Sequence, residues 1–157
     1  MTNIKTYIIS LDDIDLKRIL ETWTWLTGEN KTVIALTKLG DALLKDTDNK
    51  LYFLNTGEGD LKTISENYMD FINAKLDNEV YEELFLPTLV DELNRNDKQL
   101  LPKQVYSFYK LPLLGGTYDT ENIYVLNLYE HYNLTGEIHL QLKDLPDGTK
   151  INIKTVE

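Results

Sequence analysis

Cysteine is absent from the 157 residues, which excludes disulfides, thiolate metal sites and cysteine catalysis. No apolar run approaches the roughly 20 residues of a membrane helix, and the N-terminal residues lack the features of a secretion signal. Ser10, Ser65 and Ser107 are the only serines, and none lies in a nucleophile elbow such as GxSxG. These absences predict a cytoplasmic protein, and they leave no serine or cysteine nucleophile.

The composition is that of a folded protein, with 42% hydrophobic and 27% charged residues. A chain of this length buries about 70% of its unfolded surface, so its core needs no disulfide or metal for support. The sequence contains no internal repeat, low-complexity run or linker. We therefore expect a single domain spanning residues 1–157.

The net charge of -10 is concentrated in residues 47–100, which hold 12 acidic and 5 basic residues. An acidic protein repels phosphate, so direct nucleic-acid binding is not expected. A basic protein partner would be attracted, because charge complementarity raises association rates. Solubility alone would also account for the charge, so charge by itself does not decide between the two.

Apolar residues at helical spacing predict three helices, each beginning at a capping residue. They run from Asp12 or Asp13 to Leu26, from Ser65 to Leu76, and onward from Asp77. Pro87 lies inside the third pattern and should kink or split that helix, because proline lacks the backbone N–H and clashes with the preceding turn.

Runs rich in β-branched and aromatic residues predict strands at 32–41, 42–46, 50–56 and 61–64, with a hairpin turn at 47–49. The same signal predicts strands at 105–110, 122–128 and 150–155. Residues 129–144 are expected to form a helix broken near Gly136. Together these elements predict an α+β fold, with a mostly antiparallel sheet and helices packed against it.

The two histidines, His131 and His139, are eight residues apart and could share one helix face, with Glu130 and Glu137 nearby. A zinc site would need tighter spacing and a third ligand, and HExxH is absent. We expect structural hydrogen bonds from both histidines, no metal and no cofactor. The alternative is an enzyme of undescribed type that uses one of them.

The pair Gly115-Gly116 lacks the spacing of a phosphate-binding loop. It is typical of a turn in which the chain passes close to a neighbour. We expect Tyr118 to pack there, and Asp119 or Asn122 to hydrogen-bond back to the turn.

Ten tyrosines are many for this length, and tyrosine is favoured in protein interfaces. Tyr129 and Tyr132 flank His131 and could form an exposed aromatic cluster. An alternative function follows: a small-molecule-binding or regulatory module with an aromatic-lined pocket near Tyr118, Tyr129 and His131.

Two runs in the C-terminal third, LGGTYDTEN and LYEHYNLTGEIHLQLKDLPDGTKI, resemble the C-terminal domain of the type VI secretion DNase-immunity family. Four of the eight glycines and both histidines lie in residues 106–151, which contain these runs. Trp25-Leu26, TKLGDALLKD and LYFLNTGEGDLKTI extend the resemblance to roughly residues 23–152.

The resemblance implies an immunity protein that binds a cognate toxin, expected to be a basic nuclease domain, and inhibits it stoichiometrically without catalysis. The acidic middle of the chain agrees with such a partner, because a DNase must bind phosphate. The residues predicted to contact the partner are the acids of the region 77–92. They are Asp77, Glu79, Glu82, Glu83, Asp91 and Glu92.

Overall fold

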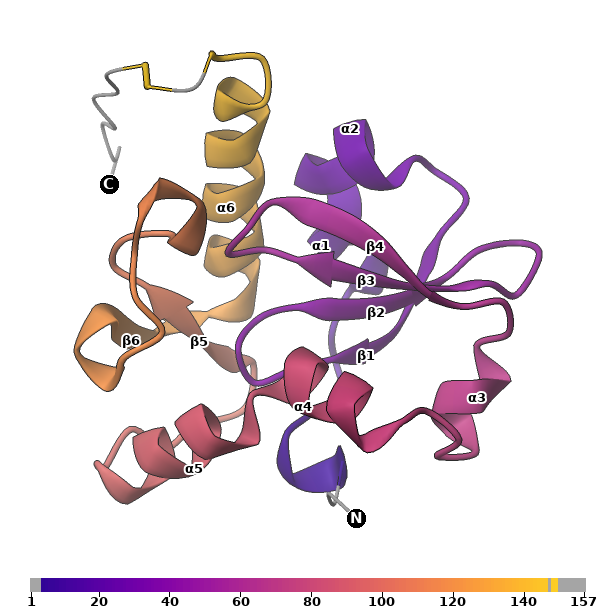
Figure 1. Cartoon of the computed structure of the whole chain (residues 1–157), viewed down its shortest axis with the longest axis horizontal. Helices are drawn as coiled ribbons and strands as arrows, with labels where there is room; N and C mark the ends of the chain where they lie inside the picture. The colour runs from indigo at the N-terminus through magenta and orange to yellow at the C-terminus, as the bar shows by residue number, and fades with distance from the viewer. Residues whose placement is uncertain (1–3, 147, 150–157) are drawn as a thin grey trace.

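A computed structural model describes residues 4–146 and 148–149, and these residues form an α+β protein (Figure 1). Four antiparallel strands make one sheet in the order β1-β2-β3-β4, and β5 pairs with β6 in a separate two-stranded sheet. The strands are β1 (Thr32–Leu36), β2 (Ala42–Lys45), β3 (Leu51–Asn55), β4 (Asp60–Ser65), β5 (Gln104–Phe108) and β6 (Ile123–Asn127). The α-helices are α1 (Leu16–Leu20), α2 (Thr24–Thr27), α3 (Met69–Ile72), α4 (Asn78–Phe85), α5 (Pro87–Arg95) and α6 (Leu128–Leu142).

The central strands of the four-stranded sheet are buried on both faces, which explains why they are apolar at successive positions, whereas the edge strand β4 is half-buried to exposed. Side chains alternate across a strand, so Leu43 and Phe53 face one side while Leu44 and Leu54 face the other. The first side packs against α3 and α4, and the second against α1, α2 and α6 (Figure 1). Trp23, which has no exposed surface, lies in the second core.

A third apolar cluster joins α5 to the β5–β6 hairpin. Leu89, Val90 and Leu93 of α5 meet Tyr106 and other hairpin side chains there. Leu39, from the turn between β1 and β2, is part of the same cluster, so the hairpin is packed onto the edge of the main sheet. Separate clusters on each side of the sheet and under the hairpin thus form one continuous α+β unit, and the predicted fold class is confirmed.

The predicted strands of the main sheet and those at 105–110 and 122–128 are confirmed, although β1 ends at Leu36 and not at residue 41. The strand expected at 150–155 lies outside the described residues. The helix caps differ from the prediction at two places. The first helix is capped by Asp15, whose side chain accepts a hydrogen bond from Arg18 N at 3.2 Å. Asp13 instead lies in a turn with φ +60°.

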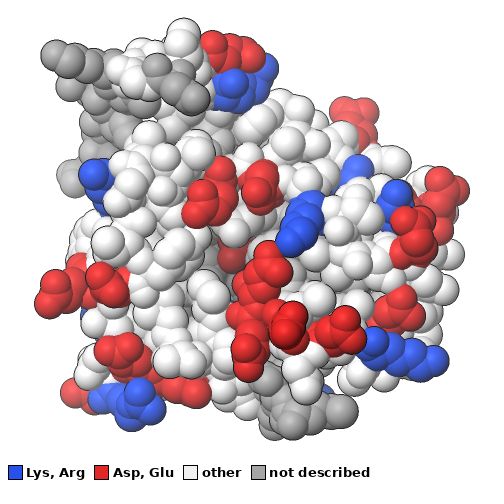
Figure 2. All heavy atoms as spheres, in the orientation of Figure 1, with Lys and Arg blue, Asp and Glu red and all other residues white. Residues whose placement is uncertain are grey.

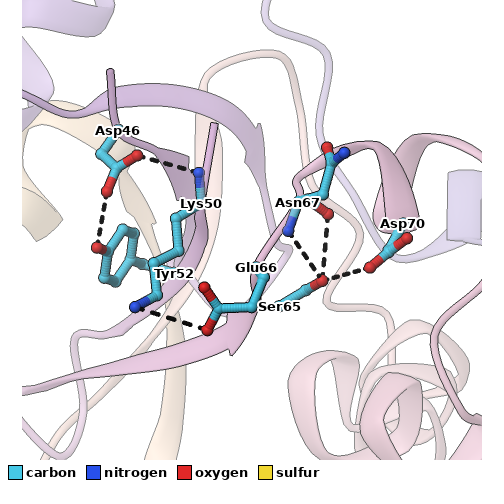
Figure 3. Close-up of polar contacts among 7 residues, drawn as sticks. All are labelled: Asp46, Lys50, Tyr52, Ser65, Glu66, Asn67 and Asp70. Atoms are coloured by element: carbon cyan, nitrogen blue, oxygen red, sulfur yellow. Dashed lines mark hydrogen bonds and ion pairs between the residues drawn. The ribbon is translucent and has the colours of Figure 1, made fainter. Parts of the chain in front are cut away.

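Ser65 does not cap a helix, because it is the last residue of β4. Its hydroxyl donates to the Asp70 carboxylate and accepts from Asn67 N (Figure 3). Asn67 takes the capping role, since its side chain accepts from Met69 N at 3.0 Å at the start of α3. The helix is only four residues long, much shorter than the prediction of Ser65 to Leu76.

The split at Pro87 is confirmed. Leu86 ends α4 in the left-handed conformation, with φ +45°, and Pro87 is the first residue of α5. The break near Gly136 is wrong, because α6 is continuous. A Cβ at Gly136 would lie 2.6 Å from Thr22 Oγ1 and 2.8 Å from Thr22 O, so this glycine allows α6 to approach the N-terminal helical segment closely.

Candidate functional site

The two histidines of α6 are buried and pin this helix to the main sheet. His131 has no exposed surface, and its ring nitrogens lie 2.8 Å from Thr56 Oγ1 and 2.9 Å from Ser107 Oγ. His139, 2% exposed, makes a hydrogen bond of 2.8 Å from Nε2 to the Thr56 carbonyl. The expectation of structural hydrogen bonds is confirmed.

Two glycines of the sheet turns make room for these rings. A Cβ at Gly40 would lie 2.3 Å from His131 Nε2, and one at Gly59 would lie 2.3 Å from His139 Nδ1. Both glycines have positive φ, +80° and +72°, which suits only glycine well. The two glycine–histidine pairs dock α6 against the β1–β2 and β3–β4 turns, and we call them the α6 latch.

From His131 a chain of hydrogen bonds runs through Thr56 to the buried carboxylate of Asp41. Thr56 N and Thr56 Oγ1 both donate to Asp41 Oδ1, at 2.8 and 3.0 Å. With the proton on His131 Nε2, every hydrogen bond in this series has one donor and one acceptor. Nε2–H donates to Thr56 Oγ1, and the Ser107 hydroxyl donates to Nδ1. Burial lowers the pKa of His131 to about 4, so the ring is neutral.

A Ser–His–Thr–Asp chain could suggest a nucleophilic site, but its members are buried. Ser107 is 1% exposed and His131 is not exposed at all, so a substrate has no access to either. The pKa of Asp41 is raised to about 7, chiefly by burial; the hydrogen bonds from Thr56 oppose this rise, and the charges of Asp60 and Glu58 add to it. The geometry is that of a structural polar network.

The Gly115-Gly116 turn has the predicted form. A Cβ at Gly116 would lie 1.8 Å from Lys110 O, so the chain passes its neighbour where only glycine fits. Asn122 holds the turn, donating to Lys110 O at 2.9 Å and accepting from Lys110 N at 3.0 Å. Tyr118 packs edge-on against Phe108 and donates to Glu58 Oε1 at 2.8 Å, which ties this turn to the β3–β4 turn.

The acids predicted on α4 lie on its exposed side. Glu79, Glu82 and Glu83 share one helix face, because residues three and four apart are neighbours on a helix. Tyr81 and Phe85 lie buried on the opposite face. Glu83 forms an ion pair with Lys62 of β4 at 2.9 Å, whereas Glu79 and Glu82 have no ion-pair partner among the described residues.

The other predicted acids have different surroundings. Asp77 precedes α4 and is exposed, but its side chain makes no capping hydrogen bond. Asp91 of α5 is half-buried and accepts the Tyr7 hydroxyl at 2.9 and 3.1 Å, so it holds the N-terminal segment. Glu92 is exposed on α5. The structure therefore sets Asp91 apart from the exposed acids.

The sequence prediction missed two acids that lie beside α4. Glu58, from the β3–β4 turn, and Asp60, the first residue of β4, interact electrostatically with each other, and the charge of Glu83 also acts on Asp60. Partial burial raises the pKa of Asp60, and the charge of Glu58 raises it further. Figure 2 shows acidic side chains gathered in front of α4 and towards the β3–β4 turn. We call this surface the acidic face; its members are Glu58, Asp60, Glu79, Glu82 and Glu83.

Asp46, outside the acidic face, has its carboxylate occupied by hydrogen bonds within the fold. Asp46 accepts from Asp48 N, Lys50 N and the Tyr52 hydroxyl, at 2.8 to 3.0 Å, and so closes the β2–β3 turn. Figure 3 shows the bonds from Lys50 and Tyr52. The hydrogen bond from Tyr52 keeps the pKa of Asp46 below its usual value. Position in a turn alone therefore does not distinguish a structural acid from one available to a partner.

The predicted aromatic cluster beside His131 is wrong. Tyr132 has no exposed surface, and the Tyr129 hydroxyl accepts from Asp15 N at 2.9 Å while Arg18 covers its ring. The cavity that Tyr118 lines includes neither Tyr129 nor His131. The prediction failed because the sequence pattern could not show which face of α6 is buried, and that face holds Tyr132 and His131.

Within the described residues, no group of three or more histidine, cysteine, aspartate or glutamate side chains could hold a metal ion. No helix in that part of the chain has both the length and the apolar character required to cross a membrane.

The fold and the buried latch define an α+β domain whose histidines support structure. Residues 65–139, just under half of the chain, match the family model for the T6SS immunity protein Tdi1, C-terminal. The match assigns this segment to a type VI secretion immunity family and confirms the resemblance to such a family over these residues. No curated protein matches the chain.

The crystal structure of Atu4351 from Agrobacterium tumefaciens is similar in fold, with a TM-score of 0.54 and 14% sequence identity. The similarity covers 79% of this chain and 65% of that one, so this chain spans less than two thirds of the length of that protein. At this identity the likeness concerns the fold alone.

Proposed function

We propose that the chain is an immunity protein that binds and neutralises a cognate type VI secretion toxin. The observation that carries this proposal is the match of residues 65–139 to an immunity family. The toxin is a DNase, and the inhibition is stoichiometric rather than catalytic. The histidines and Ser107 take no chemical part, because they are enclosed in the α6 latch.

The acidic face is the surface that meets the toxin. Its carboxylates come from two elements, α4 and the β3–β4 turn, with Lys62 as the nearby cation that pairs with Glu83. A DNase needs a basic surface to bind phosphate. Carboxylates arranged on a fixed surface would attract that basic surface and cover it. Asp77 and Glu92 extend the acidic character beyond α4, whereas Asp91 serves the fold.

The proposal is tested by co-expressing the chain with the product of the adjacent toxin gene. We expect a complex that survives gel filtration, has equimolar composition by light scattering, and protects cells from growth arrest. DNA cleavage by the purified toxin should fall linearly with added protein and stop at one equivalent. Absence of a complex with any adjacent toxin would contradict the proposal, and inhibition far below one equivalent would contradict stoichiometric binding.

A further inference from the structure

We infer that a cavity beside the acidic face receives a single arginine side chain of the toxin. The cavity has a volume of about 250 Å³ and lies between the β1–β2 turn, the α4–α5 junction and the segment after β5. Pockets for drug-sized ligands begin at about 300 Å³, so this cavity suits one side chain. The inference rests on the proposed function, since it specifies how the same face engages the toxin.

The walls of the cavity suit the aliphatic part of an arginine. Leu39, Leu86 and Phe108 line it and provide apolar surface for methylene groups. Tyr118 adds an aromatic ring, whose position is fixed by edge-on contact with Phe108 at 5.4 Å and by the hydrogen bond to Glu58. Guanidinium groups stack on aromatic rings of this kind.

The charged end of the arginine would meet carboxylates. Asp41 lines the cavity and is 7% exposed, and both hydrogen bonds that it accepts go to Oδ1. In the described part of the chain, Oδ2 accepts no hydrogen bond and no basic side chain pairs with Asp41. Glu83 is a second carboxylate of the lining, and its partner Lys62 is not among the lining residues.

A buried carboxylate without a counterion is unfavourable, and a cation in the cavity would relieve that cost. The pKa of Asp41, raised to about 7 by burial, agrees with the missing counterion. Arginine fits better than lysine, because its planar fork binds carboxylates through two parallel hydrogen bonds and is less strongly hydrated. Arginine is also enriched among the residues that dominate protein interfaces.

The inference can be tested without the toxin. The full chain is titrated with N-acetyl-arginine amide at pH 8, and its backbone amides are followed by NMR. We expect saturable shifts at Leu39, Asp41 and Tyr118. The neutral isostere N-acetyl-citrulline amide should cause none, and N-acetyl-lysine amide should bind several-fold more weakly. Equal shifts with the citrulline or the lysine compound would overturn the inference.

Two variants test the same cavity in the free protein and in the toxin complex. Asp41→Asn keeps the size of the side chain and an acceptor for Thr56, and Glu83→Gln removes a surface carboxylate together with its ion pair to Lys62. Each should weaken binding of the arginine compound and of the toxin about tenfold, as expected for a lost charge-assisted hydrogen bond. If Asp41→Asn does not fold, Glu83→Gln decides.

The two proposals fail in different ways. A toxin complex whose affinity is unchanged in Glu83→Gln and in every folded Asp41→Asn preparation overturns the arginine cavity and leaves the proposed function standing. Absence of any toxin complex with the wild-type chain overturns both.

Discussion

The inner side of α6 and the outer side of α4 use polar residues in opposite ways. His131 and His139 on α6 are 0% and 2% exposed, and their hydrogen bonds end on Thr56 and Ser107 within the fold. Glu79 and Glu82 on α4 are exposed and have no ion-pair partner among the described residues. Polar groups satisfied internally have little to offer a partner, so the latch maintains the fold and the acidic face is available for binding.

The family match does not by itself distinguish the latch from the acidic face. Both latch histidines lie inside the segment that matches the immunity family, at residues 65–139. Their glycine partners, Gly40 and Gly59, lie before that segment and are joined to it only in the folded chain. The α4 acids proposed to bind the toxin, Glu79, Glu82 and Glu83, lie in the same matched segment, so the match covers scaffold and proposed binding surface alike.

The most damaging change should be Gly40→Ala. The new methyl group would combine a positive φ with a contact of 2.3 Å to His131 Nε2. We expect the free energy of unfolding to fall by about 3–5 kcal/mol in urea denaturation. The matched control is Gly28→Ala, where φ is +70° but the nearest atom is 3.7 Å away. It should lose only about 1–2 kcal/mol. Equal losses would show that the glycine–histidine contact is unimportant.

The second prediction concerns pH. Because the pKa of Asp41 is raised to about 7, the folded protein keeps a proton that the unfolded chain releases near pH 4. This stabilisation is present at acid pH and is lost as the pH rises through 7. Relative to Asp41→Asn, the wild type should therefore gain roughly 3 kcal/mol of stability between pH 7 and pH 4.

The measurement is urea denaturation of both proteins at half-unit steps of pH. Burial also lowers the pKa of His131, to about 4, which destabilises the folded state as the pH falls below 6.5. That effect is present in both proteins and cancels in the difference. A stability difference that does not change with pH would contradict a raised pKa for Asp41.

A smaller loss is expected for Thr56→Val, which keeps the shape but removes the hydroxyl between Asp41 and His131. We expect about 2 kcal/mol of destabilisation, because buried partners are left unsatisfied. Thr63→Val, at an exposed position of β4, is the matched control and should change little. Toxin affinity of folded Thr56→Val should fall less than that of Asp41→Asn, because the Asp41 carboxylate is kept; a loss as large as that of Asp41→Asn would place the Thr56 hydroxyl in the interface.

Local signals in the sequence predicted most of the elements. The strands of the main sheet followed from β-branched and apolar runs, and the split at Pro87 followed from the chemistry of proline. The prediction at Gly136 was wrong because this glycine is required by a tertiary contact: its missing side chain leaves space for Thr22, and α6 continues through it. Ser65 was misassigned because a strand and its hydrogen bond to Asp70 took precedence over capping.

The candidate site was only partly predictable for the same reason. The sequence predicted the acids of 77–92 as partner contacts, and Glu79, Glu82 and Glu83 among them are exposed on one face of α4. It could not show that Glu58 and Asp60 come beside them, because that proximity depends on how α4 packs across the sheet. The residues Gly57-Glu58-Gly59-Asp60 indicate a turn, but the sequence does not show which elements lie next to it in space.

The smallest effect on stability is expected from charge reversal on α4. Glu79→Lys/Glu82→Lys changes two exposed residues without ion-pair partners in the described part of the chain. The free energy of unfolding should therefore stay within about 0.5 kcal/mol of wild type. Thermal unfolding at matched ionic strength measures this, and a larger loss would mean that these acids support the fold.

The central claim is tested most directly by the association rate constant of the toxin, measured by stopped flow. Glu79→Lys/Glu82→Lys should slow association about tenfold at low salt, with the difference shrinking as salt is added. Glu121→Lys/Glu137→Lys, an equal charge change at exposed sites on other elements, should slow association far less. Equal slowing by both double variants would contradict a binding role for the acidic face and leave net charge as the cause.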